Sequence, residues 1–258
     1  MGEVKLNDQP DAFEPEELDA EVELVPASGA STALVKPGEA RFVGHLKKPY
    51  LQIAHGVGGL SQAGFQPGEI VLNKKVVVYS PAKLVKGATV PASAPVTVTV
   101  ISAVDYWKEV TKYGDPKLPR TWPTEADALA AGMTTQYPPF GSGLPLPTAR
   151  AALNIDLLVR EPEGVEDRGE FLFKLDGAYW APARFICDKA MYTESIDPMT
   201  RAKISHGPSG LYSATFELST FNKLIKSTGN YTWVPAWRLV KTKTPEQIVE
   251  IQRLLTNG

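Results

Sequence analysis

Cysteine and histidine are scarce in this sequence of 258 residues, which has one cysteine, Cys187, and three histidines. A single cysteine excludes an intramolecular disulfide, and a chain of this length buries enough surface to fold without one. The histidines His45, His55 and His206 are far apart and form no HxH or HExxH spacing. These absences argue against a zinc centre, and we predict no metal and no cofactor.

Long apolar runs are also missing. No stretch approaches the eighteen or so uninterrupted apolar residues that a membrane-spanning helix requires. The first residues show no basic segment followed by an apolar one, so a secretory signal is not indicated either. We therefore expect a cytoplasmic protein that does not bind membranes.

No group of residues has the pattern of a catalytic centre. The glycines at 56–59 lack the lysine and hydroxyl residue of a phosphate-binding Walker loop. Cys187 lies in a strand-like stretch without a neighbouring histidine, which is typical of a small buried side chain. Asp176 and Asp188 are carboxylates of the type that could act as a pair, but acids are common in turns and on exposed strands. We predict that the chain is not an enzyme.

Charge is distributed unevenly along the sequence. The formal net charge is −2, but residues 1–25 carry nine acids against one lysine, a net charge of −8, which leaves +6 on the remaining 233 residues. The first 32 residues are poor in aromatics and rich in proline and alanine, so we predict a disordered acidic tail at 1–32. This tail either improves solubility, competes for the basic surface of the body, or recruits replication or recombination proteins.

The body, residues 33–258, has the pattern of a single mainly β domain. Alternating or β-branched stretches predict strands at 50–55, 69–79, 96–107, 152–161, 170–175, 181–193, 211–218 and 230–241. Gln66–Glu69 and Asp176–Tyr179 have turn composition. We expect an antiparallel architecture in which these strands follow one another.

Two segments depart from the strand pattern. Residues 114–150 hold seven prolines and four glycines, which predicts an irregular insertion with one short helix capped by Thr124 and ended by Gly132. At the end of the chain, Thr244 and Gln247 form a capping box and Pro245 takes the first helical position. The spacing that follows predicts a C-terminal helix.

Basic and aromatic residues alternate in two blocks. Residues 41–86 hold seven lysines or arginines and one acid, and residues 211–243 hold five and one. Single-stranded nucleic acid is bound by this combination, because cations follow the phosphates while rings stack on unpaired bases. The alternative is that many rings pack in the core and that the lysines protect strand edges. The predicted binding residues are Lys48, Lys74, Lys75, Trp107, Lys112, Tyr113, Trp180, Trp233, Trp237, Arg238 and Lys241.

The β-rich body, with the stretches KKPYLQIAHG, PGEIVLNKKVVVY, VDYWKEVTKY and WVPAWRLVKTKTPEQIVEIQRLL, resembles the OB-fold single-stranded-DNA-binding proteins of bacteriophages. These features cover roughly 60% of the chain. The resemblance implies an elaborated OB-like antiparallel barrel, no cofactor and no reaction. The length, the insertion at 114–150 and the N-terminal position of the acidic tail differ from the usual bacterial form.

We therefore predict a protein that coats single-stranded DNA without sequence specificity during phage replication or recombination, acting in the host cytoplasm and binding RNA as an alternative ligand. A second hypothesis is a virion structural or assembly protein with a β-sandwich body. In that case the proline-rich insertion would serve as an arm that contacts a neighbouring subunit.

Overall fold

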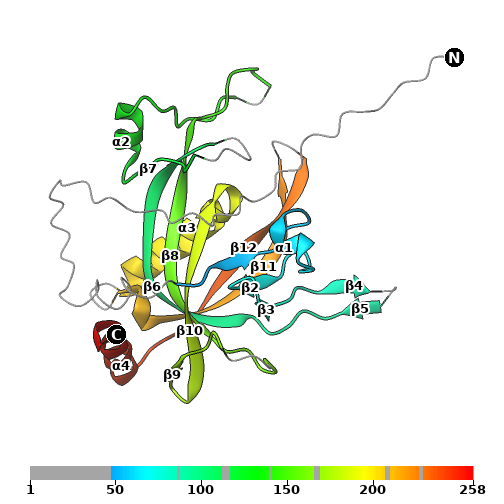
Figure 1. The fold of residues 1–258 in the computed structure, drawn as a ribbon. Helices are drawn as coiled ribbons and strands as arrows, with labels where there is room; N and C mark the ends of the chain where they lie inside the picture. Colours follow the sequence, from blue (N-terminus) through cyan, green and yellow to red (C-terminus); the bar gives the residue numbers. More distant parts are fainter. Residues whose placement is uncertain are drawn as a thin grey trace.

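The computed structural model describes residues 48–85, 88–111, 117–139, 141–165, 169–206, 210–226 and 229–257. Its main sheet is antiparallel, in the order β12-β11-β6-β8-β10-β9, with β7 paired to β6 (Figure 1). The prediction of a mainly β, antiparallel fold is confirmed. The strands are β6 (Val96–Glu109), β7 (Thr121–Trp122), β8 (Ala149–Arg160), β9 (Phe173–Leu175), β10 (Ala178–Asp188), β11 (Ala214–Ile225) and β12 (Asn230–Thr242).

The two faces of the main sheet differ in chemistry, as β8 illustrates. Leu153, Ile155 and Leu157 are buried, whereas Asn154 and Asp156 between them are half-buried. Successive side chains of a strand point to opposite faces, so the aliphatic residues share one face and the polar residues share the other. We call these the inner face and the outer face.

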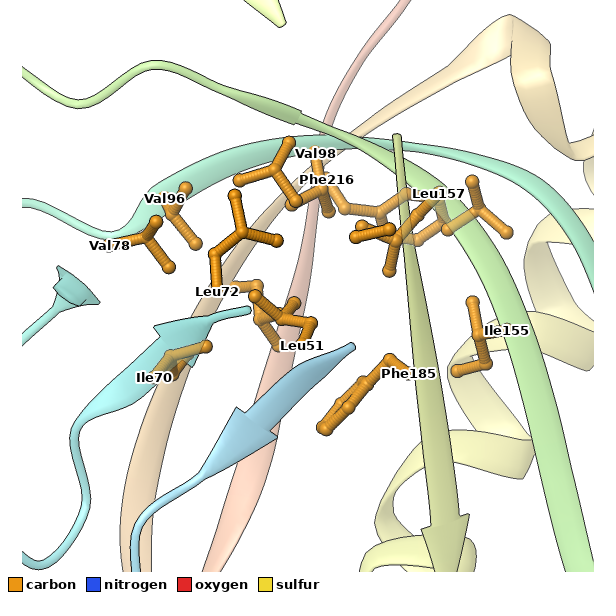
Figure 2. Close-up of a cluster of buried hydrophobic side chains, with 14 of the residues drawn as sticks. Leu51, Ile70, Leu72, Val78, Val96, Val98, Ile155, Leu157, Phe185 and Phe216 are labelled. Carbon is orange, nitrogen blue, oxygen red and sulfur yellow. The ribbon is translucent and has the colours of Figure 1, made fainter. Parts of the chain in front are cut away.

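The hydrophobic core lies against the inner face. A second antiparallel sheet packs there, formed by β1 (Leu51–Ile53), β2 (Ile70–Leu72) and β3 (Val76–Tyr79). Figure 2 shows side chains from both sheets gathered in this core, among them Leu51 and Phe185. Removing such apolar surface from water stabilises the fold by about 25 cal/mol per Å².

A long helix, α3 (Lys189–His206), connects β10 to β11 and packs against β12, β8 and β10 (Figure 1). Its buried residues are Ser195, Met199 and Ala202. Their spacing of four and three places them on one side of the helix, which faces the core.

The predicted strand at 181–193 is correct only as far as Asp188, and its last five residues form the first turns of α3. Lys189 has φ 50, a left-handed conformation that ends the strand and redirects the chain. The sequence analysis also missed the helix that follows. Pro198 lies inside it, and proline is normally taken as a helix breaker.

The two predicted helices are confirmed. The insertion contains α2 (Glu125–Ala130), whose N-cap Thr124 accepts a hydrogen bond from the backbone N–H of Asp127. The C-terminal helix is α4 (Pro245–Asn257), and its capping box is formed. The Thr244 N–H donates to Gln247 Oε1 at 3.0 Å, and the Gln247 N–H donates to Thr244 Oγ1 at 3.4 Å. Both helix starts follow from local sequence.

The predicted turns are also present. In the turn at Gln66–Glu69, the Glu69 N–H donates to Gln66 O at 3.0 Å and leads into β2. Asp176 and Gly177 have positive φ and join β9 to β10 as a two-residue hairpin turn. The glycine-rich stretch before Phe65 contains the single-turn helix α1 (Gly59–Gln62), and a short 3-10 turn, η2 (Leu211–Ser213), precedes β11.

The main sheet does not close into a barrel. Within the described residues no ladder joins β10 to β12, and β1 contacts both strands instead. Tyr50, just before β1, forms a parallel bridge to Arg184 on the free edge of β10. The part of β10 that a closing strand would need is therefore already occupied.

Two segments extend from this body. The chain between β6 and β8, residues 110–148, carries β7 and α2, and we call it the excursion. The hairpin of β4 (Lys83–Val85) and β5 (Ala88–Val90) forms a separate two-stranded sheet, which we call the arm. Among the described residues no helix has the length and apolar character needed to span a membrane. The predicted tail at 1–32 lies outside the described residues.

Candidate ligand-binding face

The outer face of β8 and β10 brings several charged side chains together. Strand register places Lys108 opposite Arg150 and Arg184 opposite Asp156, so these four side chains share one face. Tyr50 joins them through its bridge to Arg184. We call the following set the outer-face site: Lys48, Tyr50, Val104, Tyr106, Lys108, Arg150, Asn154, Asp156, Arg184, Ile186 and Asp188.

Asp156 contacts two cations of the site. Its Oδ2 accepts a hydrogen bond from Lys48 Nζ at 2.5 Å, and its Oδ1 accepts one from Arg184 Nε at 3.1 Å. The Lys48 side chain is only 6% exposed. Burial lowers the pKa of this ammonium, while the hydrogen bond to Asp156 opposes the shift. A bound phosphate would therefore compete with Asp156 for these cations.

A second ion pair joins neighbouring strands, because Arg150 Nη2 donates to Asp188 Oδ2 at 2.7 Å. Burial, and then the charge of Asp188, raises the pKa of the Tyr106 phenol to about 12. His55 lies near the same carboxylate, and burial lowers the pKa of its imidazole. At neutral pH the phenol is therefore a hydrogen-bond donor without charge, and the imidazole is also neutral.

Some polar atoms at this face are buried without a hydrogen-bond partner in the part of the chain that the structure describes. They include Arg150 Nε and Asn154 Oδ1, with Gln52 Oε1 on the adjoining β1. A buried polar group without a partner costs about 1–3 kcal/mol, which a polar ligand or an ordered water recovers. Val104, opposite Asn154, is 58% exposed, so the face is open to solvent there.

Three of the rings predicted to stack on bases pack in or against the core. Trp180 is buried, and its Nε1 donates to Leu175 O at 3.1 Å. Trp233 and Trp237 pack against the core, where Trp237 meets Phe216 edge-on with ring centroids 6.0 Å apart. These rings stabilise the fold, and we do not retain them as stacking positions.

Trp107, near the end of β6, is half-buried and pairs across the strands with Trp122. The guanidinium carbon of Arg120 lies 5.4 Å from the centroid of the Trp122 ring, a cation–π contact. Arg120 also donates two side-chain hydrogen bonds to the Glu109 carboxylate, at 2.9 and 3.0 Å. This contact lowers the pKa of Glu109 to about 2.

The predicted phosphate-binding residues fall in separate places. Lys74 and Lys75 are exposed in the β2–β3 turn, which borders the outer-face site because the Asn73 N–H donates to Tyr50 O at 2.8 Å. Lys75 Nζ lies 3.7 Å from Glu170 Oε1. The structure thus places these two lysines near Lys48.

Arg238 and Lys241 are exposed on β12, which β11 and β6 separate from β8 in the sheet order. Arg238 forms an ion pair with Glu217 on β11. These two residues do not join the outer-face site. Lys112 and Tyr113 lie outside the described residues.

Sequence reasoning missed Arg150, Arg184 and Tyr106, which all belong to the outer-face site. A signal was present in β8, where Arg150, Asn154 and Asp156 occupy positions of one parity between aliphatic residues. That alternation marks them as one face of a strand. Their meeting with Arg184 and Tyr106 depends on the strand register, which the sequence does not specify by itself.

Cys187 is fully buried and behaves as the sequence predicts. Burial raises the pKa of its thiol to about 12, and Ser195 Oγ lies 3.4 Å from the sulfur. A neutral, enclosed thiol is a poor nucleophile. Among the described residues no group of three or more His, Cys, Asp or Glu side chains is arranged to hold a metal ion.

Comparisons of the chain with protein-family models, with curated proteins and with solved structures gave no match. The functional argument therefore depends on the chemistry of the outer-face site and of the surfaces around it.

Proposed function

We propose that this chain binds single-stranded DNA without sequence specificity, on the outer face of β8 and β10. The observation that carries the proposal is the charge of the outer-face site. Its eleven residues hold four cations and two carboxylates, a net charge of +2, on a chain whose formal net charge is −2. A local excess of positive charge attracts a polyanion and raises its rate of association.

The position of the site agrees with an open OB-like barrel. The five long strands follow one another along the chain as β6, β8, β10, β11 and β12. OB folds bind oligonucleotides on the face of the second and third strands, between the loops that follow the first and fourth strands. In this chain those strands are β8 and β10, and those loops are the excursion and the β11–β12 turn.

An aromatic side chain also occurs in a flanking region, because Tyr231, largely exposed, lies at the β11–β12 turn. An exposed ring stacks on any unpaired base, and each stacked base contributes about 1–3 kcal/mol. Trp107 alternates with Tyr106 and Lys108 along β6, so it and its cross-strand partner Trp122 lie on the opposite face. Tyr231 is therefore the stacking position in the proposal.

The test is fluorescence anisotropy of a labelled oligo-dT at low and moderate salt, with a duplex competitor. We expect tight binding that weakens with salt and resists the duplex. The same titration with an oligo-rU probe asks whether RNA is an equally good ligand. Absence of binding at low salt, where electrostatic attraction is strongest, would refute the proposal.

Lys75→Gln locates the binding surface, because Lys75 is exposed beside the site and its substitution has little effect on folding. We expect a weaker complex and a salt slope that is shallower by about one ion. Lys203→Gln, an exposed lysine on α3, is the matched control and is expected to leave the slope unchanged.

The acidic segment 1–25 is expected to compete for this surface, and a protein without residues 1–32 tests that expectation. Removing the segment is expected to strengthen oligo-dT binding most at low salt, since salt screens the competition. Unchanged affinity would leave solubility or recruitment of replication proteins as its role. A protein that coats single-stranded DNA during phage replication or recombination would act in the cytoplasm of the host cell.

A second candidate function is that of a structural or assembly protein. Several large apolar side chains on the excursion are exposed, among them Tyr137, Leu144 and Leu146. Exposed apolar groups in one segment are typical of protein–protein contact sites. This function becomes the first candidate if oligo-dT does not bind.

A further inference from the structure

Buried polar atoms without a hydrogen-bond partner gather at the outer face. Among the described residues there are five such side-chain atoms. Two of them, Arg150 Nε and Asn154 Oδ1, belong to the outer-face site, and a third, Gln52 Oε1, lies on the adjoining β1. Folded proteins leave few such atoms, because each loses its hydration without gaining a hydrogen bond. The concentration of three of the five at one place indicates a polar ligand.

Strand register places Asn154 at the centre of the site. It lies opposite Val104 on β6 and opposite Ile186 on β10. Val104 is exposed, and Ile186 is half-buried. This row therefore offers one hydrogen-bonding group with an apolar side chain on each side of it, a combination that suits a flat ring with a polar edge.

A second amide adjoins this row. The parallel bridge between Tyr50 and Arg184 sets β1 beside β10, and the two strands contact each other. Two residues further along both strands, this register brings Gln52 beside Ile186. The amides of Gln52 and Asn154 therefore come from the two strands that flank Ile186.

The Asn154 oxygen can turn toward a ligand at little cost. The torsion that orients an asparagine amide has a broad, roughly two-fold energy profile. No described residue donates a hydrogen bond to Oδ1, so turning this atom toward the open side at Val104 breaks no hydrogen bond. The atom is covered in the protein without ligand and becomes an acceptor beside one.

An unpaired nucleobase has the chemistry that this row requires. Each of the four bases carries at least one N–H group on its Watson–Crick edge, which an amide oxygen accepts, and its faces pack on apolar side chains. In a duplex the complementary strand already binds these N–H groups. The two cations that contact Asp156 lie two residues further along β8, about 7 Å away, where phosphates of the same strand would bind. The third unpartnered atom, Arg150 Nε, is a donor that suits a phosphate oxygen.

We propose that Asn154 and Gln52 accept hydrogen bonds from the Watson–Crick N–H groups of unpaired bases, and that this contact makes the outer-face site selective for single strands. Every base offers such a group, so the contact excludes duplexes without adding sequence specificity. The inference rests on the proposed function. It gives the two amides a role that charge cannot perform, because single strands and duplexes both carry phosphates.

The test compares two probes by fluorescence anisotropy at one salt concentration. One is labelled oligo-dT, and the other is the same oligomer with a methyl group on N3 of each thymine. This methyl group removes the only N–H of the base and leaves the phosphates unchanged. We expect the unmodified protein to bind the methylated oligomer about tenfold more weakly. Oligo-dU, which keeps the N3–H and lacks the 5-methyl group, is the probe control and is expected to bind like oligo-dT.

Asn154→Leu connects this difference to the amide, because leucine is of similar size and has no hydrogen-bonding group. We expect the variant to bind oligo-dT more weakly and to lose most of the difference between the two probes. The ratio of its single-strand affinity to its duplex affinity is expected to fall by the same factor.

Asn222→Leu is the matched control. Asn222 is exposed on β11 and has the parity of the core residues Phe216 and Leu218, so it lies away from the outer face. This variant is expected to keep the tenfold difference between the probes.

Stability separates this role from a structural one. Leucine at position 154 removes a buried acceptor without a partner, so Asn154→Leu is expected to keep or raise the unfolding midpoint in urea. Gln52→Leu is a second variant with the same expected midpoint and with a smaller difference between the probes. Lowered midpoints in both variants would mean that the amides stabilise the fold, and would contradict the proposal.

The inference and the proposed function fail in different ways. Absence of binding to both oligomers would refute them together. Tight and equal binding of oligo-dT and the methylated oligomer would overturn this inference alone. An Asn154→Leu variant that keeps the tenfold difference would do the same.

Discussion

Gly68 occupies a position in the turn before β2 that only glycine fits. Its φ is 87, and a Cβ there would lie 2.7 Å from the Trp233 ring and 2.9 Å from Pro81 Cγ. The Gly68 carbonyl also accepts a hydrogen bond from Thr220 Oγ1 at 2.6 Å. This residue therefore joins the turn to β11 and β12 at close approach.

Gly68→Ala is expected to lower the free energy of unfolding by about 1–3 kcal/mol, because the ring and the turn must move to admit the methyl group. Gly64→Ala is the control, since Gly64 also has positive φ but open space at its Cβ position. Urea denaturation of the two variants measures the difference. Equal losses would mean that backbone strain, and not the contact with Trp233, limits this position.

Lys243 is a buried lysine at the junction of β12 and α4. Its Nζ donates to Ala214 O at 3.1 Å and to Thr215 Oγ1 at 2.6 Å. Burial and then the charge of Lys241 lower the pKa of this ammonium, and the charge of Asp176 opposes the shift. The resulting pKa is about 8.

Because the unfolded chain keeps the ordinary lysine pKa, it binds more protons than the folded protein between about pH 8 and 10.5. The contribution of Lys243 to stability is therefore expected to rise with pH across this window. Lys243→Met removes the rise, and Lys203→Met, at an exposed lysine on α3, keeps it. Urea denaturation at pH 8 and pH 10 measures this, and identical pH profiles for Lys243→Met and the unmodified protein would contradict the assignment.

At the scale of elements, the contact between Glu109 and Arg120 ties the excursion to the end of β6. The backbone N–H of Arg120 also donates to Glu109 Oε2, at 3.1 Å. The lowered pKa of Glu109 means that this contact is complete above pH 4.5 and is lost as the pH falls toward 2. At neutral pH this carboxylate thus adds a side-chain contact to the backbone pairing of β6 and β7.

Glu109→Gln is expected to loosen the excursion without unfolding the body, because the contact is largely at the surface. Limited proteolysis at neutral pH measures this as faster cleavage between residues 110 and 148. Glu217→Gln, which breaks the exposed pair with Arg238 on β11 and β12, is the control. Equal cleavage rates in the two variants would show that Glu109 does not hold the excursion.

Elements with local signals could be predicted, and elements set by distant contacts could not. The capping boxes at Thr124 and Thr244 and the turn at Asp176 depend on neighbouring residues only, and all three are present. The start of α3 at Lys189 depends on how the chain leaves β10 and covers the core. The sequence pattern of its first residues, 189–193, is therefore that of a continued strand.

For the candidate site, too, features that depend on local sequence could be predicted and features that depend on distant contacts could not. The sequence predicted Lys48, Lys74 and Lys75 from their charge, and the turn that carries Lys74 and Lys75 is hydrogen-bonded to Tyr50, two residues after Lys48. It could not assign Trp180 and Trp237 to the core, because a ring on a strand has the same local pattern on either face.

At the scale of the whole molecule, charge and apolar surface are separated. The outer-face site is cationic, the arm and the excursion are apolar, and the first 25 residues are strongly acidic. The central claim is that the outer face of β8 and β10 carries the nucleic acid.

The measurement that tests this claim most directly is oligo-dT affinity after neutralising one cation of the site. Arg150→Gln lowers the net charge of the outer-face site from +2 to +1, and the glutamine amide can still donate to Asp188. Arg201→Gln makes the same change at the exposed pair with Asp197 on α3.

We predict that Arg150→Gln binds oligo-dT several-fold more weakly, with a salt slope shallower by about one ion, and that Arg201→Gln binds like the unmodified protein. Equal affinities for the two variants would contradict the placement of nucleic acid on this face.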